Sequence, residues 1–141
     1  MKTYYAVIDT NVIVSSFLNH DSLPGKIVDL VVDQTIIPLL SQEILEEYSE
    51  VLLRNKFNLA PEKIREFIAE WIEKGVFPGR KETSQDFVDK DDIVFFEITL
   101  SGRSTMGAYL VTGNLRHYPA ESFVVTPRQM IEIIEKDELK R

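Results

Sequence analysis

The sequence predicts an α/β protein, a three-layer α/β/α sandwich with a small central parallel sheet and an added helical hairpin. Two observations support this prediction. Four short runs are continuously apolar instead of alternating, as in parallel strands covered on both faces. Amphipathic segments with helical spacing separate most of these runs. The 141 residues, 44% of them hydrophobic, suit one domain over residues 1–141, with a frayed tail expected at 136–141.

The apolar runs are the predicted strands, and each is bounded by polar or turn-forming residues. They are Tyr4–Ile8, Thr35–Leu39, Ala108–Thr112 and Phe123–Thr126. In open parallel sheets, ligands bind beyond the carboxyl ends of the strands. We therefore expect functional residues to follow these strands.

The predicted helices have apolar residues spaced three and four positions apart. They are Pro24–Val32, Ser41–Arg54, Pro61–Lys74, Ile93–Leu100 and Pro127–Lys136. No strand separates Ser41–Arg54 from Pro61–Lys74, so these two helices are expected to form a hairpin beside the sheet. Residues 76–88 include Pro78 and Gly79 and are expected to form an irregular connection.

Composition excludes several classes of function. The chain has no cysteine, which excludes disulfides and thiolate chemistry and fits a reducing cytoplasm. The apolar run after Met1 is too short for a signal peptide, and no stretch approaches membrane-spanning length. We therefore expect a cytoplasmic protein with no membrane contact. The formal net charge of −7 argues against a protein that coats nucleic acid but not against a nuclease with a metal site.

Two candidate acids follow predicted strands. Asp9 directly follows the first strand, and its simplest role would be the N-cap of a helix that starts near Asn11. Its place at the carboxyl end of a central strand favours a metal ligand instead. Glu47 lies at the rim of the apolar stripe of its helix, where it can reach into a cleft, and Glu43 is the second choice.

Three further acids precede the helix predicted at Ile93–Leu100. Asp89 and Asp92 resemble a capping box, and acids in a first turn complement the helix dipole. Three acids exceed what capping needs, and Asp92 lies on the apolar side of the helix, so we select it, with Asp91 as a substitute. Clustered carboxylates without an obvious cationic partner indicate a hard divalent metal ion and phosphodiester chemistry.

The predicted strand that ends at Thr112 is also followed by polar residues. Gly113 and Asn114 would form a good turn, which is the simpler interpretation. A lone histidine such as His117 is more often structural, and contact with the substrate is an equal alternative here. The residues expected to contact substrate or orient water are Thr10, Asn11, Thr112, Asn114, Arg116 and His117.

Taken in order, these motifs resemble those of the PIN domain family. Asp9–Val12 matches the family's opening motif after the first strand. Ser41–Tyr48 resembles the helix of the second acid, and its register places the family's glutamate on Glu47. Asp91–Glu97 resembles the helix of the third acid, and its register selects Asp92. The resemblance covers essentially the whole chain.

The segment Tyr109–Pro119 resembles a bacterial and archaeal PIN subfamily of VapC-like toxin components. The resemblance implies an endoribonuclease for single-stranded or structured RNA, in which Asp9, Glu47 and Asp92 hold Mg²⁺ or Mn²⁺ for hydrolysis. It also implies the toxin of a toxin–antitoxin pair, with an antitoxin protein as partner, and a homodimer. Many PIN domains have aspartate where this chain has Asn114, which leaves one-metal and two-metal chemistry as alternatives.

Two other functions are alternatives. A catalytically inactive PIN-like module that binds RNA or protein is compatible with Asn114 and the acidic net charge. A phosphatase or receiver domain also places acids at strand ends, but Asn11 occupies the position of the phosphatase's second aspartate. No lysine follows the late strand as a receiver requires. If RNA is the substrate, Arg103, Arg116 and His117 would guide it, although no basic stripe is evident.

Overall fold

A four-stranded parallel sheet, in the order β2-β1-β3-β4, forms the centre of the fold. The computed structural model describes residues 2–85, 87 and 89–140. The strands are β1 (Tyr4–Ile8), β2 (Ile36–Pro38), β3 (Tyr109–Val111) and β4 (Val124–Val125). Ile8 of β1 pairs with Val111 of β3, so the carboxyl ends of these strands meet at one edge. The predicted parallel sheet is confirmed.

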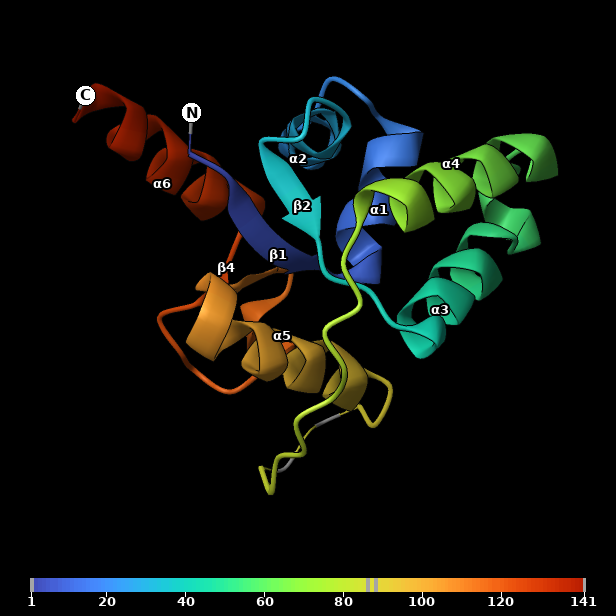
Figure 1. Cartoon of the computed structure of the whole chain (residues 1–141). Helices are drawn as coiled ribbons and strands as arrows, with labels where there is room; N and C mark the ends of the chain where they lie inside the picture. Colours follow the sequence, from blue (N-terminus) through green and yellow to red (C-terminus); the bar gives the residue numbers. More distant parts are fainter. Residues whose placement is uncertain (1, 86, 88, 141) are drawn as a thin grey trace.

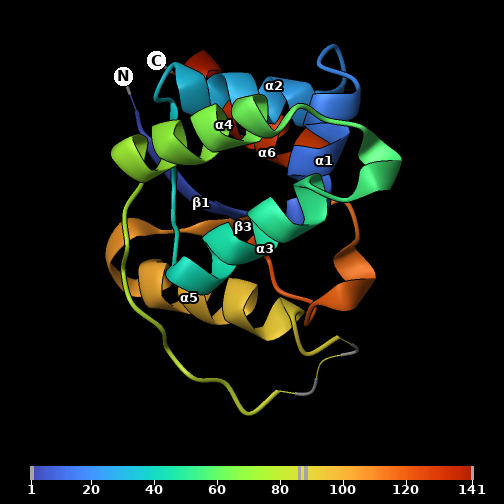
Figure 2. The same ribbon diagram turned by 90° about the vertical axis from the view of Figure 1, so that its right-hand side faces the viewer.

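Helices cover both faces of the sheet, which confirms the three-layer sandwich (Figures 1 and 2). On one face, α5 (Asp92–Met106) packs against β1 and β3. The opposite face is covered by α1 (Thr10–Leu18), α2 (Leu23–Val32) and α6 (Pro127–Leu139). No helix in the described part of the chain is long and apolar enough to cross a membrane.

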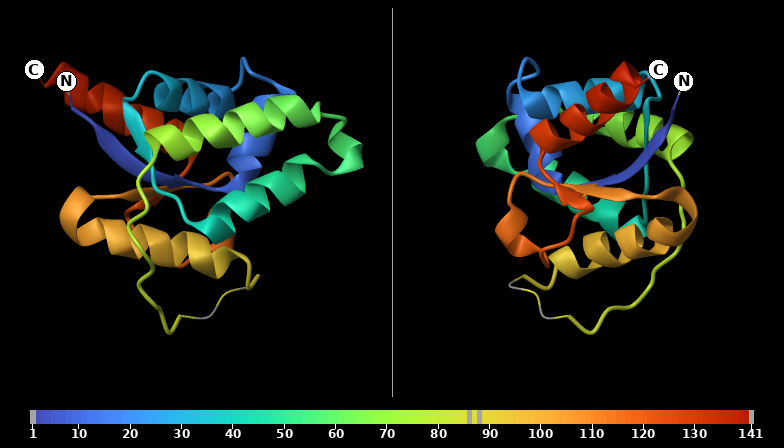
Figure 3. Two further views of the ribbon diagram at one scale, coloured as in Figure 1. Left: turned by 45° about the vertical axis from the view of Figure 1, so that its right-hand side comes forward. Right: turned by 90° about the vertical axis from the view of Figure 1, so that its left-hand side faces the viewer.

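The expected helical hairpin lies on one flank of the sandwich (Figure 3). It consists of α3 (Gln42–Leu52), the 3-10 turn η1 (Asn55–Phe57) and α4 (Pro61–Lys74). Aromatic rings join the two helices: the Tyr48 ring contacts that of Trp71 edge-on, with centroids 5.9 Å apart. Because α3 also contacts α1 and α5, the hairpin fixes α3 beside the carboxyl end of β1.

The connection between the hairpin and α5 is irregular, as expected, after one short contact with the sheet. Val76 forms an isolated parallel bridge with Leu39. Beyond it, the described residues before Asp92 form no helix or strand. Glu97 of α5 holds this segment, since its Oε2 accepts a hydrogen bond of 2.6 Å from the backbone N–H of Thr83. Asp86 and Val88, which belong to the predicted connection, lie outside the described residues.

Two helices are longer than the sequence pattern predicts. Helix α5 continues past Leu100 to Met106, where Gly107 ends it in the left-handed conformation with φ +60°. The tail expected to fray from residue 136 is helical to Leu139. The reason is that Asp137 accepts hydrogen bonds from Lys2 Nζ (3.0 Å) and the Tyr4 hydroxyl (2.6 Å). Arg141 lies outside the described residues.

The hydroxyl of Tyr48 ties the hairpin to the sheet. This ring is fully buried, and its hydroxyl donates a hydrogen bond of 2.5 Å to the carbonyl of Ile8 at the end of β1. Burying a hydroxyl is unfavourable unless it has such a partner. The bond therefore helps to set the position of α3 against the edge of the sheet where ligands bind in α/β folds.

Replacing Tyr48 by phenylalanine should lower the free energy of unfolding by about 1–3 kcal/mol, because the bond to the Ile8 carbonyl is lost in a buried site. Urea denaturation measures this change. Tyr5→Phe is the matched control, because none of the described residues hydrogen-bonds the Tyr5 hydroxyl. That control should stay within about 0.5 kcal/mol of wild type. Equal stability of the two variants would show that the Tyr48 bond has no such role.

Candidate functional site

Asp9 lies directly beyond β1 and is only 4% exposed. Its Oδ1 accepts a hydrogen bond of 2.8 Å from the backbone N–H of Thr10, so Asp9 is the N-cap of α1. Its Oδ2 accepts from the Thr112 hydroxyl at 2.7 Å and from Nδ2 of Asn11 at 3.2 Å. Asp9 thus caps a helix and also joins the ends of β1 and β3. The N-cap role is confirmed, and the role as a metal ligand stays a prediction.

Glu47 reaches Asp9 from helix α3. Its Oε2 accepts a hydrogen bond of 2.5 Å from the hydroxyl of Thr10, the residue next to Asp9. Glu47 is half-buried, whereas the other three acids of α3 are exposed; they are Glu43, Glu46 and Glu50. The structure therefore places Glu47 beside the strand end, as its position on the helix indicated.

Asp92, the first residue of α5, is buried beside the same edge of the sheet. Its Oδ1 receives a long hydrogen bond of 3.5 Å from the hydroxyl of Tyr118. Its Oδ2 is buried and receives no hydrogen bond from the described residues; Nδ1 of His117 lies 3.5 Å away, too far for a strong bond. Asp91 is exposed, and its backbone N–H bonds to the Asp89 carboxylate at 2.9 Å.

The loop after β3 is tied to the site through side chains. The backbone N–H of Asn114 donates to the Thr112 hydroxyl at 3.0 Å, and that of Gly113 donates to Oδ1 of Asn11 at 3.0 Å. Nδ2 of Asn114 lies 2.9 Å from Nε2 of His117. With the amide donating, Nε2 accepts, and the imidazole proton sits on Nδ1, which faces Asp92.

Two arginines named from the sequence do not join this group. Arg116 is exposed and has no partner among the described residues. Arg103 lies near the far end of α5, where it donates a hydrogen bond of 2.8 Å to the carbonyl of Ala108. Its guanidinium also lies 4.8 Å from the centroid of the Phe123 ring. Arg103 is thus engaged at the opposite end of α5 from Asp92 and does not belong to the group of acids; its role in guiding a substrate stays a prediction.

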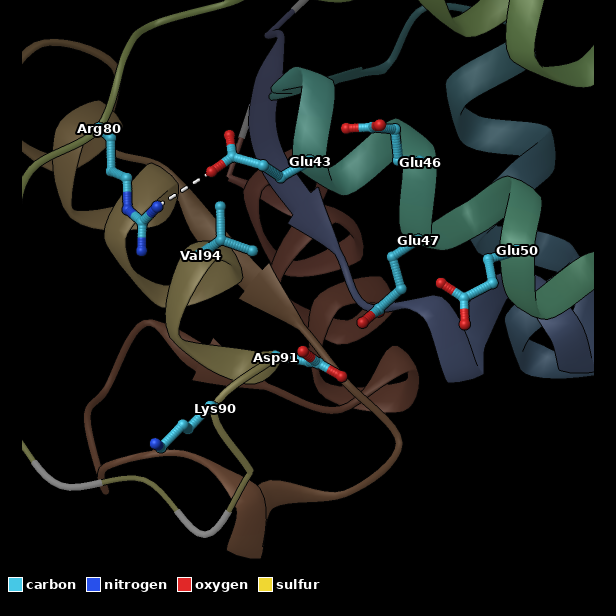
Figure 4. A pocket seen from close by; sticks show the side chains of 8 residues that line it. All are labelled: Glu43, Glu46, Glu47, Glu50, Arg80, Lys90, Asp91 and Val94. Carbon is cyan, nitrogen blue, oxygen red and sulfur yellow. Dashed lines mark hydrogen bonds and ion pairs between the residues drawn. The ribbon is translucent and has the colours of Figure 1, made fainter.

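A cavity of about 370 Å³ opens beside Glu47 (Figure 4). Its lining residues are Glu43, Glu46, Glu47, Glu50, Arg80, Lys90, Asp91 and Val94. Sequence patterns did not indicate Arg80, because the irregular connection that contains it has no periodicity or motif. Lys90 lies between Asp89 and Asp92, and the pattern there concerns acids alone. The helical pattern assigns the glutamates of α3 to a helix face, but no sequence pattern indicates that this face lies next to the connection before α5. Tyr118, which contacts Asp92, was also not selected.

Burial and mutual repulsion make the acids hard to ionise together. Burial, together with the charges of Asp9, Asp91 and Asp92, raises the pKa of Glu47 to about 7, although the hydrogen bond from the Thr10 hydroxyl opposes the rise. Burial and then the charge of Asp9 raise the pKa of Asp92 to about 6. Burial also raises the pKa of Asp9, against the bond from Thr112. Binding of protons or of a cation therefore stabilises this group of acids, because it reduces the repulsion among them.

The residues fit a hard divalent cation that is held partly through water. As the side chains stand, no three Asp, Glu or His residues of the described chain converge closely enough to enclose an ion. However, Mg²⁺ keeps several of its waters and often uses only one or two carboxylates. The unpartnered Oδ2 of Asp92 is a free carboxylate oxygen, and a cation there would relieve the repulsion among Asp9, Glu47 and Asp92.

Comparison with known proteins agrees with this fold. An uncharacterized protein of Methanocaldococcus jannaschii is 28% identical over 145 aligned positions, which cover 92% of this chain and 91% of that protein. A family model described as the PIN domain matches residues 5–116. That match includes β1 from Tyr5 onward, the α3–α4 hairpin, α5 and β3, and therefore all the acids of the site. The chain belongs to the PIN domain family.

Proposed function

We propose that this protein is a divalent-metal-dependent endoribonuclease that hydrolyses phosphodiester bonds of single-stranded or structured RNA. The PIN domain is a nuclease-type fold, and its members typically use divalent metal ions. The observation that carries the proposal is the meeting of Asp9, Glu47 and Asp92 at one sheet edge, with Oδ2 of Asp92 buried and unpartnered.

In this proposal Asp9, Glu47 and Asp92 hold Mg²⁺ or Mn²⁺, and Asp91 lies close enough to contribute charge. When bound, such an ion offsets negative charge on the phosphate and activates water for hydrolysis. Thr10 and Thr112 keep the carboxylates of Glu47 and Asp9 oriented. The buried ring of Tyr118 excludes water from one side of the acids.

The loop after β3 would contact the RNA. His117 presents its protonated Nδ1 towards Asp92 and is half-exposed, and Asn114 holds that ring in place. Arg116 is exposed and free to meet the strand. Asn114 is a neutral amide, so it supplies no charge for a second ion, and its Nδ2 is engaged by His117. We therefore propose one-metal chemistry.

We also propose that the protein is the toxin of a toxin–antitoxin pair, acts as a homodimer in the cytoplasm and is restrained by an antitoxin protein. The support is the resemblance of Tyr109–Pro119 to toxin components of the family. Induced expression in a bacterial host tests the toxic role, since growth should stop with the wild type and continue with the Asp9→Asn variant. Light scattering of the purified protein tests the dimer.

Asp9→Asn should abolish RNA cleavage and weaken Mn²⁺ binding, because it removes a ligand charge. The chain should stay folded but lose some stability, because an amide has one acceptor oxygen in place of the two that now receive bonds from Thr10, Thr112 and Asn11. Calorimetric titration of Mn²⁺, a single-stranded RNA cleavage assay and circular dichroism measure the three effects. Undiminished cleavage would refute the metal-site assignment. A wild type that binds RNA but neither binds Mn²⁺ nor cleaves would favour the inactive binding module.

Glu47→Gln should lower kcat/KM for RNA by about 100-fold, a range seen when residues around metal sites are changed. Glu46→Gln is the matched control, because it removes the same charge from the next position in the lining of the same cavity, where the carboxylate is exposed and lies apart from that of Glu47 (Figure 4). That control should change kcat/KM by less than about threefold. Equal losses in the two variants would mean that only bulk charge matters.

Mn²⁺ affinity should rise as pH increases from 5.5 to 8. In the metal-free protein the pKa of Glu47 is about 7 and that of Asp92 about 6, so both carry protons at low pH that an ion must displace. Because these folded-state pKa values are raised, the metal-free fold should lose stability as pH rises through this window. Calorimetry in two buffers with different ionisation enthalpies measures the released protons. Glu47→Gln should release fewer protons near pH 7 than wild type, with Asp92 as a remaining source; release that is undiminished in this variant would contradict the assignment.

A further inference from the structure

We propose that Arg80 binds a backbone phosphate of the RNA other than the phosphate that is cut, and that this phosphate takes the place of Glu43 on the guanidinium. The inference rests on the proposed ribonuclease function and extends it to a substrate-binding residue. It starts from the cavity beside Glu47, in which acidic side chains outnumber basic ones. A polyanion can enter such a cavity only where a cation meets it, and Arg80 and Lys90 are its basic lining residues.

Arg80 is held in one orientation by a buried acid. Its Nε donates a hydrogen bond to Oε1 of Glu97, whose side chain is only 4% exposed. The other oxygen of Glu97, Oε2, accepts a hydrogen bond of 2.6 Å from the backbone N–H of Thr83. Glu97 thus fixes both the guanidinium and the chain segment that carries it. A guanidinium fixed through Nε presents its two terminal nitrogens as a fork, which matches the oxygens of a phosphate.

The terminal nitrogens of Arg80 face the cavity and are only loosely engaged. Nη1 donates to Oε2 of Glu43 at 3.0 Å, and none of the described residues accepts a hydrogen bond from Nη2 (Figure 4). The Glu43 side chain is 56% exposed. Such an exposed ion pair contributes little to stability, so a phosphate can replace Glu43 at small cost. Glu97, which is buried, would keep its bond.

The position of Arg80 indicates which phosphate it binds. Glu47 and Asp91 lie towards one end of the cavity, and Arg80 lies towards the other (Figure 4). A phosphate on Arg80 is therefore a different phosphate of the strand from the one at the acids. It follows that Arg80 matters for oligonucleotides and not for a dinucleotide, which has a single linking phosphate.

The test compares Arg80→Ala, Arg80→Lys and Glu43→Gln with wild type, with Glu46→Gln as the charge-matched control. Single-stranded RNA binding in EDTA is measured over a range of salt concentrations. Arg80→Ala should reduce the slope of log K against log salt by about 0.7, the value for one phosphate contact on a single strand. Glu43→Gln should tighten binding several-fold more than Glu46→Gln, because it frees the fork of Arg80.

Cleavage gives the second readout. Arg80→Ala should raise KM for an oligonucleotide about tenfold, with kcat, dinucleotide cleavage and Mn²⁺ affinity little changed. Arg80→Lys keeps the charge but loses the fork of two terminal nitrogens, so its KM should lie between that of wild type and that of Arg80→Ala. If Arg80→Ala leaves the buried Glu97 without its partner and fails to fold, the KM of Arg80→Lys and the RNA affinity of Glu43→Gln test the inference.

Two outcomes would overturn the inference. An unchanged salt slope and KM in folded Arg80→Ala, or equal RNA affinity of Glu43→Gln and Glu46→Gln, would show that Arg80 has only a structural role. In that case wild-type cleavage still supports the ribonuclease. Conversely, a wild type that binds RNA with a salt slope that Arg80→Ala reduces, and yet does not cleave it, would support the phosphate site at Arg80 and refute the proposed ribonuclease activity. A wild type with neither property would remove both.

Discussion

The hydrogen bonds that hold the buried carboxylate of Asp9 are the interaction on which the rest of the site depends. A buried carboxylate is costly unless donors satisfy it, and here the donors come from both α1 and the end of β3. Thr10 also donates through its hydroxyl to Glu47 and so connects α3 to the same point. Three segments far apart in the chain are therefore fixed together by one acid at a strand end.

This arrangement places acids where they repel one another, which conflicts with stability in the metal-free state. Burial and neighbouring charges raise the pKa values of Glu47 and Asp92 towards neutrality. A sequence selected for stability alone would not keep Oδ2 of Asp92 buried without a partner. Such local conflicts are expected at functional sites, where a ligand completes the interactions that the chain leaves open.

The formal charge of −7 is compatible with an RNA substrate because the negative and positive groups are arranged unequally. The acids of α3 and Asp91, which directly precedes α5, line one cavity, and the connection before α5 brings Arg80 and Lys90 to the same lining. Glu97 makes this possible, since it holds the connection from within α5. The buried Glu97 of α5 thus determines where the guanidinium of Arg80 lies beside the site.

The sequence by itself determined the parallel sheet, its covering layers, the hairpin and the acids that follow the strands. These features depend on periodicity and on strand ends, which are local patterns, and the same reasoning separated Glu47 from its neighbours on α3. Only the tertiary structure brought Arg80 to the cavity, placed Tyr118 on Asp92 and removed Arg103 from the site. Arg80 and Glu43 are 37 positions apart, and a contact between residues so distant leaves no periodic signal in either segment. Packing of the whole chain decides it.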